Sequence, residues 1–278
     1  LMDAMPIDFA EELRAWSSQL QSSKDMLSIL EKKFLELPQG GTAVGSGINA
    51  HKQFAKYFAQ EMTKLSGNKY KCVPSKNFYH ELSAQDCSVQ LSGELKNLAV
   101  ILMKISNDLR WMNSGPLAGL SEIELKALQP GSSIMPGKVN PVIPEAVAMA
   151  SADVIGNDVS ITVAAQSGSF QLNVMLPVIA YNLLKSINLL SGAMDVLSKK
   201  AIKTFKVNNK NLEISLSKNP ILVTALNPII GYEKAAAIAK KAYKENRPII
   251  DVAAEETNLS KSKLSKLLDP TKLAKGGM

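Results

Sequence analysis

The spacing of apolar residues predicts a chain that is almost entirely helical. Across residues 7–37 and 83–112, apolar side chains recur at steps of three and four, so each segment carries one apolar stripe. A shorter amphipathic helix is predicted over 52–65, and no stretch alternates long enough to build a sheet. The stripe of the 83–112 helix has the 4-3-4-3-4 spacing of a bundle seam and consists of Leu91, Leu95, Leu98, Leu102, Ile105 and Leu109.

Two further long helices are predicted over 145–165 and 171–199. The first is rich in Ala, Ser, Val and Gly on nearly every face, a pattern that predicts a helix buried on all sides. The second carries a single apolar stripe. Long seams joined by short loops predict an up-and-down helical bundle. The strong apolar character of the two helices over 145–165 and 171–199 also predicts that they pack against other subunits. Proteins usually cover such surfaces by forming homo-oligomers.

After residue 206 the predicted segments become shorter, and Asn227-Pro228 and Arg247-Pro248 separate some of them. The fold class is therefore all-α, with two predicted domains. A central helical bundle covers 1–206 and contains a loop at 130–144, and a small helical domain covers 207–278. The short helices of the second domain are predicted at 208–217, 221–226, 232–245, 249–257 and 260–268.

Composition places the chain among soluble globular proteins. Of its 278 residues, 46% are hydrophobic and 21% are charged. Polar residues interrupt the apolar stretches, so no membrane partner is expected. The only cysteines are Cys72 and Cys87, and there are two histidines, which argues against a disulfide framework and a zinc site. The sequence offers no set of metal ligands, and a reducing location is expected.

The net charge of +7 belongs to the C-terminal part of the chain. Residues 199–278 hold 16 Lys and Arg against 7 Asp and Glu. A nucleic-acid partner would favour basic residues interleaved with exposed aromatic residues. The lysines are instead scattered at helical spacing, which predicts solvated helix faces and no nucleic-acid partner.

The segment 131–141, Gly-Ser-Ser-Ile-Met-Pro-Gly-Lys-Val-Asn-Pro, fits neither a helix nor a strand. Its glycines and prolines predict an ordered loop with special backbone requirements. Within it lie two hydroxyls, one ammonium and one carboxamide, a set that can hold a carboxylate and move a proton beside it. On composition alone, a flexible linker in which Ser132 and Ser133 are turn formers is an equally good interpretation.

Three segments, in this order, resemble the fumarase/aspartase superfamily, whose members are lyases that add or remove a small group across the double bond of a dicarboxylate. They are Gly-Gly-Thr-Ala-Val-Gly-Ser-Gly-Ile-Asn at 40–49, Ser-Asn-Asp-Leu-Arg-Trp at 106–111 with Ser114-Gly115-Pro116, and the loop at 131–141. Within that superfamily the segments 222–228 and 230–236, together with Gly137, resemble class II fumarases. The resemblance covers essentially the whole chain. It implies no metal or organic cofactor, and a location in the cytoplasm, or in the mitochondrial matrix if the source is eukaryotic.

The resemblance implies a role for each polar residue of the loop. Ser132 would be the base, with its alkoxide stabilised by backbone N–H groups and nearby positive charge. Ser133 would bind substrate, Lys138 would neutralise the substrate carboxylate, and Asn140 would donate a hydrogen bond to it.

Three more residues receive implied roles. Glu145 would pair with a catalytic histidine from another subunit, although without the resemblance a first-turn carboxylate that complements the helix dipole is the favoured explanation. Thr42 and Asn49 would shape the site, and capping and turn formation are their alternative roles.

Residues outside these motifs receive other interpretations. Asn157 and Asp158, in the middle of an apolar helix, are interpreted as a satisfied polar network of the core. No neighbouring sequence pattern predicts a role for His80.

The expected activity is hydration of fumarate to L-malate in a homotetramer whose active sites each combine residues of three subunits. Aspartate ammonia-lyase is the alternative enzyme, and a catalytically inactive helical scaffold is the alternative without chemistry. Family members carry Gly-Arg-Thr-His immediately before the point that matches Leu1, so a preceding segment with part of the site is expected. Residues 75–81 depart from the usual Asn-Lys-Phe-Glu-Ala.

Overall fold

The computed structural model describes residues 2–276, so the outermost residues of both predicted domains lie outside the described range. The chain separates into two compact units. The bundle unit consists of Ser18–Arg110 and Leu125–Thr204, and the terminal unit of Leu1–Ser17, Trp111–Glu124 and Phe205–Met278. The predicted boundary between 206 and 207 stays a prediction.

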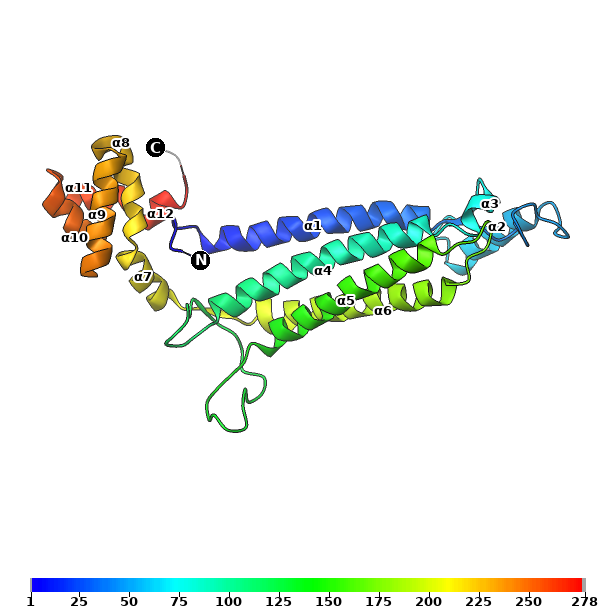
Figure 1. Cartoon of the computed structure of the whole chain (residues 1–278), viewed down its shortest axis with the longest axis horizontal. Helices are drawn as coiled ribbons and strands as arrows, with labels where there is room; N and C mark the ends of the chain where they lie inside the picture. The colour runs from blue at the N-terminus through cyan, green and yellow to red at the C-terminus, as the bar shows by residue number, and fades with distance from the viewer. Residues whose placement is uncertain (1, 277–278) are drawn as a thin grey trace. The chain divides into compact units, whose positions relative to one another are not determined.

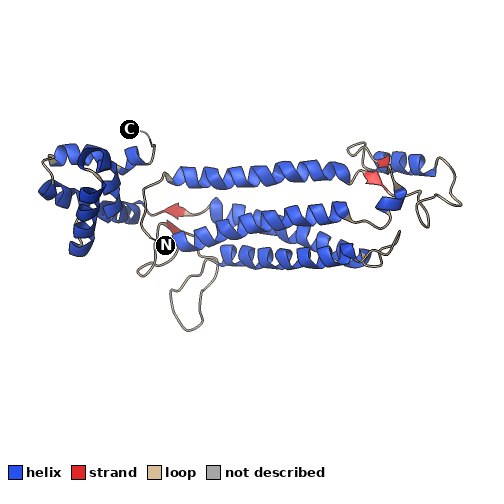
Figure 2. Ribbon diagram, turned by 45° about the horizontal axis from the view of Figure 1, so that its top comes forward, coloured by secondary structure: helices blue, strands red, loops and turns tan. Residues whose placement is uncertain are grey.

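Four long helices form the body of the bundle unit and run side by side (Figures 1 and 2). Their positions confirm the four long helices that the apolar periodicity predicts. They are α1 (Phe9–Lys33), α4 (Asp86–Met112), α5 (Val142–Gln166) and α6 (Leu176–Leu197).

Some helix ends differ from the prediction for local reasons. Helix α5 begins three residues early, so Pro144 lies in its first turn, where its missing N–H costs no helical hydrogen bond. Helix α6 begins late because Ser169 and Leu172 form a tight turn in which each backbone N–H donates to the carbonyl of the other. At its other end, α6 continues into one π-helical turn, η1 (Ser198–Ile202).

The apolar seams predicted from the sequence are buried. In α4 the buried stripe contains Leu95, Leu98, Leu102, Ile105 and Leu109. The closest helix pair of the bundle is α5 with α6. Both helices contribute buried aliphatic side chains: Val147, Val154 and Ile161 from α5, and Ile179, Leu183 and Leu190 from α6.

A buried carboxylate joins α5 to α4. The side chain of Asp158 is 8% exposed, and its two oxygens accept hydrogen bonds from Ser92 Oγ at 2.7 Å and Lys96 Nζ at 2.6 Å. The preceding residue, Asn157, donates a hydrogen bond from its Nδ2 to Ser186 Oγ of α6 at 3.2 Å. These contacts confirm Asn157 and Asp158 as a satisfied polar network. Each of these hydrogen bonds forms only at one position of the two helices along each other. The network therefore fixes how far α4, α5 and α6 are shifted relative to one another along their axes.

The prediction that α5 is buried on all sides is wrong for a single chain. Its outer face exposes Met149 to 68% and Val159 to 60%, because the helices of one chain cover only its inner face. Among residues 2–276, α5 is also the one helix with the length and apolarity of a membrane span. It packs against α6 and carries the partnered Asp158, as a bundle helix does.

Short elements occupy the end of the bundle unit where α4 begins (Figure 1). They are α2 (Phe54–Leu65), α3 (Phe78–Glu81) and two strands, β1 (Glu36–Leu37) and β2 (Val73–Pro74), that pair in parallel. The predicted helix over 7–37 therefore ends early, because Leu37 pairs with Pro74 in this small sheet.

The terminal unit has a compact helical core, as the shortened segments predict. A two-residue antiparallel pair of β3 (Ile123–Glu124) with β4 (Lys206–Val207) precedes its helices. Fully or nearly fully buried Leu226, Ile238, Val252 and Leu264 lie at the centre of its core. The helices are α7 (Asn209–Lys218), η2 (Pro220–Leu226), α8 (Asn227–Ile230), α9 (Tyr232–Glu245), α10 (Ile249–Glu256), α11 (Lys261–Leu267) and α12 (Pro270–Leu273).

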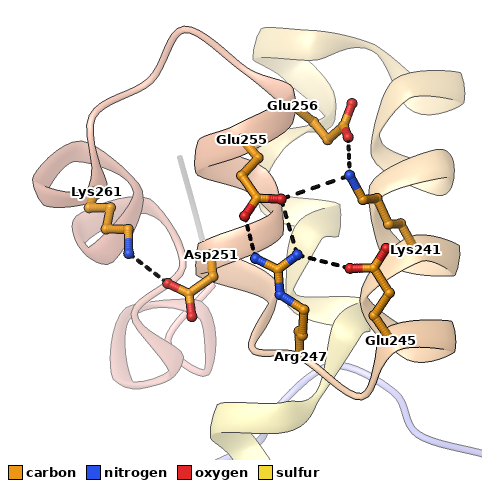
Figure 3. A network of polar contacts seen from close by, with 7 residues as sticks. All are labelled: Lys241, Glu245, Arg247, Asp251, Glu255, Glu256 and Lys261. Atoms are coloured by element: carbon orange, nitrogen blue, oxygen red, sulfur yellow. Dashed lines mark hydrogen bonds and ion pairs between the residues drawn. The ribbon is translucent and has the colours of Figure 1, made fainter.

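A chain of ion pairs joins α9, α10 and α11 on the surface of this core (Figure 3). Arg247 donates to both Glu245 and Glu255, and Lys261 donates to Asp251 at 2.8 Å. The hydrogen bond from Arg247 lowers the pKa of Glu255, and the one from Lys261 lowers the pKa of Asp251. A lowered carboxyl pKa stabilises the fold above the ordinary carboxyl range, and this contribution is lost as the pH falls through that range.

We expect Asp158→Ala to lower the free energy of unfolding by about 2–3 kcal/mol, because it leaves Ser92 and Lys96 without their buried acceptor. Asp153 lies on the same helix, but its side chain is 43% exposed and pairs with Lys185. The matched Asp153→Ala should therefore cost less than about 1 kcal/mol. Urea denaturation of both variants measures the difference, and equal losses would contradict a stabilising role for the buried network.

Candidate functional site

The loop between β3 and α5 closes on itself at its base. The backbone N–H of Gly131 donates to the carbonyl of Lys138 at 2.7 Å, and Asn140 Nδ2 donates to the carbonyl of Gly131 at 3.3 Å. A β-carbon on Gly131 would lie 2.6 Å from the Lys138 carbonyl oxygen and 2.9 Å from the Asn140 nitrogen. Only glycine fits this neck, and the closed neck favours an ordered loop over a flexible linker.

Ser132 lies just inside the neck with its hydroxyl oxygen turned toward the backbone. Its Oγ accepts hydrogen bonds from the N–H groups of Ile134 and Met135, each at 3.2 Å. Two N–H donors on one oxygen favour negative charge on that oxygen. The side chain is half-buried, so a small ligand can reach it. The expectation that backbone N–H groups surround Ser132 agrees with this geometry, while its role as the base stays a prediction.

The other polar residues of the loop differ in their exposure. Ser133 and Lys138 are exposed to solvent, and Asn140 is half-buried with its amide nitrogen bonded to Gly131. The structure thus gives Asn140 a loop-closing contact, and it leaves Ser133 and Lys138 free to meet a ligand. Substrate binding by all three residues stays a prediction.

Glu145 lies in the first turn of α5, four residues beyond Pro141, whose carbonyl accepts its backbone N–H at 3.1 Å. Its side chain is half-buried. Among residues 2–276, no hydrogen bond or ion pair involves its carboxylate. The position suits a carboxylate that complements the helix dipole, and it also leaves the group available for a partner from another segment or subunit.

The glycine-rich loop, residues 40–49, has a strained backbone. Thr42 and Asn49 both have positive φ, 54° and 65°, in the left-handed region that non-glycine residues rarely adopt. Both side chains are exposed, and neither residue caps a helix. Strain of this kind persists where the surroundings impose it, and it is concentrated at functional sites.

Helix α3 provides the surface on which the glycine-rich loop rests. A β-carbon on Gly41 would lie 2.8 Å from Cβ of Phe78, and one on Gly45 would lie 2.7 Å from the backbone nitrogen of Tyr79. The glycine backbone therefore packs directly against Phe78 and Tyr79 of α3, with no room for a side chain at either glycine. Any movement of α3 must displace this loop.

The two loops lie at opposite ends of the bundle unit (Figure 1). The glycine-rich loop belongs to the end where α4 begins, and the loop that carries Ser132 belongs to the other end, where α5 begins. Helix α4 has 27 residues, which corresponds to about 40 Å. A single chain therefore brings Ser132, Ser133, Lys138, Asn140 and Glu145 into one region but does not bring Thr42 and Asn49 to them.

Comparison with known protein families accounts for most of the chain. Residues 1–156, which include α1, α4 and the Ser132 loop, match the family model described as lyase. The chain belongs to the lyase family. Residues 222–275 match the model described as fumarase C C-terminus. The resemblance to class II fumarases within this family is therefore confirmed.

Relatives with known names agree with this family. Fumarate hydratase class II 2 of Pseudomonas aeruginosa is 59% identical over the whole chain, and the class II enzyme of Bacillus subtilis is 43% identical over 99% of it. The chain spans 60% and 59% of their respective lengths.

Solved structures share the fold. The class II fumarase of Schistosoma mansoni superposes with a TM-score of 0.94 at 34% identity, over 98% of this chain and 60% of that one. The cobalt-bound fumarate lyase:delta crystallin of Brucella melitensis gives 0.93 at 40% identity, over 99% and 59%. The all-α bundle predicted from the sequence is confirmed.

Sequence reasoning predicted backbone N–H donors for Ser132 but did not identify which residues supply them. The N–H groups of Ile134 and Met135 have no side-chain signature, and only the closed loop places them. The sequence feature that could have identified them is the position of Ser132, two residues before Ile134 and three before Met135. Serine side chains commonly accept hydrogen bonds from such nearby backbone N–H groups in turns.

We expect Gly131→Ala to open the neck of the loop, because the added carbon collides with two backbone atoms. Amide exchange across 131–140 should accelerate by roughly tenfold or more, a local opening cost of about 1.4 kcal/mol. Gly156→Ala is the control, since an added carbon there meets nothing within 4 Å. Exchange measured by mass spectrometry that stays unchanged in Gly131→Ala would show that the neck does not hold the loop.

Proposed function

We propose that the protein is a class II fumarate hydratase, which reversibly and stereospecifically adds water to fumarate to give L-malate. The observation that carries the proposal is the pair of N–H donors on Ser132 Oγ inside a closed, partly exposed loop. Membership of the lyase family and the match to the fumarase C C-terminus support it.

In the direction from malate, the reaction removes a proton next to a carboxylate, and the electrons of the broken C–H bond move into that carboxylate. A serine hydroxyl is too weak a base for this step unless its alkoxide is stabilised. Two hydrogen bonds to a charged oxygen contribute about 3–6 kcal/mol together. Ser132 then takes the proton, while Lys138 neutralises the carboxylate that receives the charge and Ser133 and Asn140 hold the substrate.

The same geometry supports assembly into a homotetramer. Thr42 and Asn49 lie one helix length away from Ser132, so they meet it only if another copy supplies them. The outer faces of α5 and α6 are apolar yet exposed in one chain, with Met149 on α5 and Leu184, 61% exposed, on α6. Contiguous apolar faces of this kind are typical of subunit interfaces. Glu145 faces such a shared site, where it would pair with a histidine of another subunit.

We place the enzyme in a reducing compartment, the cytoplasm of a bacterium or the mitochondrial matrix of a eukaryote. Cys72 and Cys87 are both free thiols in the fold, and burial is the main cause that raises the pKa of Cys87. A raised thiol pKa keeps the cysteine protonated and inert.

We expect malate to form from fumarate in plain buffer when this chain is combined with the N-terminal segment of the Pseudomonas aeruginosa relative. Ser132→Ala should lower kcat on the order of 10³-fold, because both the base and its N–H contacts are lost. Ser133→Ala keeps the base and serves as the matched control, with a smaller loss expected mainly in KM. Product formation is followed by the loss of fumarate absorbance and by chromatography.

The assay also separates the alternatives. A folded wild-type assembly that forms aspartate with ammonium but no malate in plain buffer would replace the proposal with an ammonia-lyase. A folded assembly that does neither would replace it with an inactive scaffold.

A further inference from the structure

His80 lies between two carboxylates at the junction of α3 and α4. Its Nε2 is 2.8 Å from Asp86 Oδ2, and its Nδ1 is 3.1 Å from Glu81 Oε1. Asp86 is the first residue of α4, whereas His80 and Glu81 belong to α3. The histidine therefore spans the turn between a short helix and a long one.

The protonation state of the ring decides how many of these contacts are hydrogen bonds. A neutral imidazole has one N–H and can donate to one carboxylate only, whereas an imidazolium donates to both. The hydrogen bond with Asp86 is the main cause that raises the pKa of His80, and the charge of Glu81 acts in the same direction. The groups around the neighbouring Cys87 thiol add Lys33 of α1 and Glu36 of β1, one positive and one negative charge.

The contact between His80 and Asp86 joins α3 to the first turn of the long helix α4. Asn77 Oδ1 caps α3 by accepting the backbone N–H of His80 at 3.2 Å, and the N–H of Ala84 donates to the His80 carbonyl at 3.0 Å. These bonds order the turn, and the side-chain contact then fixes α3 against the first turn of α4. Since α3 carries the glycine-rich loop through Phe78 and Tyr79, this contact also sets the position of that loop.

We propose that His80 is a positioning residue that, in its protonated form, clamps α3 to the start of α4 and thereby holds the glycine-rich loop in its site-shaping geometry. The proposal rests on the proposed function only in assigning that loop to the site. His80 lies within residues 75–81, the segment that the resemblance marks as a departure from the usual family sequence.

The pH dependence follows from the sign of the shift. A histidine whose pKa is raised by folding stabilises the fold fully below its unfolded value, near 6.5. This contribution is lost as the pH rises through the higher folded value. The clamp is therefore complete in mildly acidic solution and weakens in alkaline solution.

The chain offers an internal control, because its two histidines differ in their surroundings. His51 accepts a backbone N–H from Gln53 on its Nδ1 at 3.2 Å, whereas His80 faces two carboxylates. In a ¹⁵N NMR titration of the full chain, Asp86→Asn should lower the pKa of His80 and leave His51 unchanged. Equal titration of His80 in wild type and variant would overturn the proposal.

Amide exchange tests the mechanical link. After correction for the intrinsic pH dependence of exchange, wild-type exchange across 40–49 should be several-fold faster at pH 8.5 than at pH 6. In Asp86→Asn and His80→Gln it should be fast at both pH values, while exchange across 131–140 stays as in wild type. Exchange across 40–49 that is unaffected by pH and by both variants, in chains with native circular dichroism, would overturn the proposal.

The pH dependence of KM gives a further test, because a purely structural role of His80 would leave it unchanged. In the assembly with the relative's N-terminal segment, Asp86→Asn should raise KM at pH 6 toward the wild-type value at pH 8.5. The wild-type assembly could form no malate while amide exchange across 40–49 still depends on the protonation of His80. That result would contradict the proposed activity and support the positioning role of His80. A KM that keeps its wild-type pH dependence in Asp86→Asn would overturn the positioning role.

Discussion

The length of α4 is the constraint on which the rest of the structure depends. Its buried stripe keeps it straight and packed along about 40 Å, and each end carries one of the two loops with strained or closed backbones. The glycine-rich loop is held at the first end through α3, and the loop with Ser132 follows the second end. No adjustment of side chains can bring Thr42 to Ser132 within one copy.

The polar network around Asp158 and the exposed apolar outer faces of α5 and α6 both bear on where the Ser132 loop lies and what it meets. Asp158, Ser92 and Lys96 fix how α4 and α5 slide past each other, and so they fix where the Ser132 loop emerges. The apolar outer surfaces of α5 and α6 remain without cover in one chain. A second copy that covers them can also supply the missing loop, which makes assembly part of the proposed chemistry.

Periodicity predicted three of the four long helices, because a buried stripe repeats over many turns and small errors cancel, whereas α5 was predicted from its uniformly small and apolar composition. Helix ends were less predictable, since they depend on contacts such as Leu37 with Pro74 or the turn at Ser169 and Leu172. The resemblance assigned Ser132 to the candidate site, but the N–H donors of Ser132 depend on closure of the loop. The surroundings of His80 were missed because Asp86 reaches it only across a folded turn. Burial of α5 on all sides was wrongly predicted for a single chain, because its outer face, with Met149 and Val159, is exposed there.

The most direct test of the shared site is complementation between two variants of the assembly with the relative's N-terminal segment. Ser132→Ala disables one loop and Asn49→Ala the other, and both variants should be folded and of native size. If each site combines Ser132 from one copy with Asn49 from another, dissociating and reassembling a mixture should restore malate formation well above either variant alone. A mixture that exchanges subunits but stays as inactive as its parents would contradict the account.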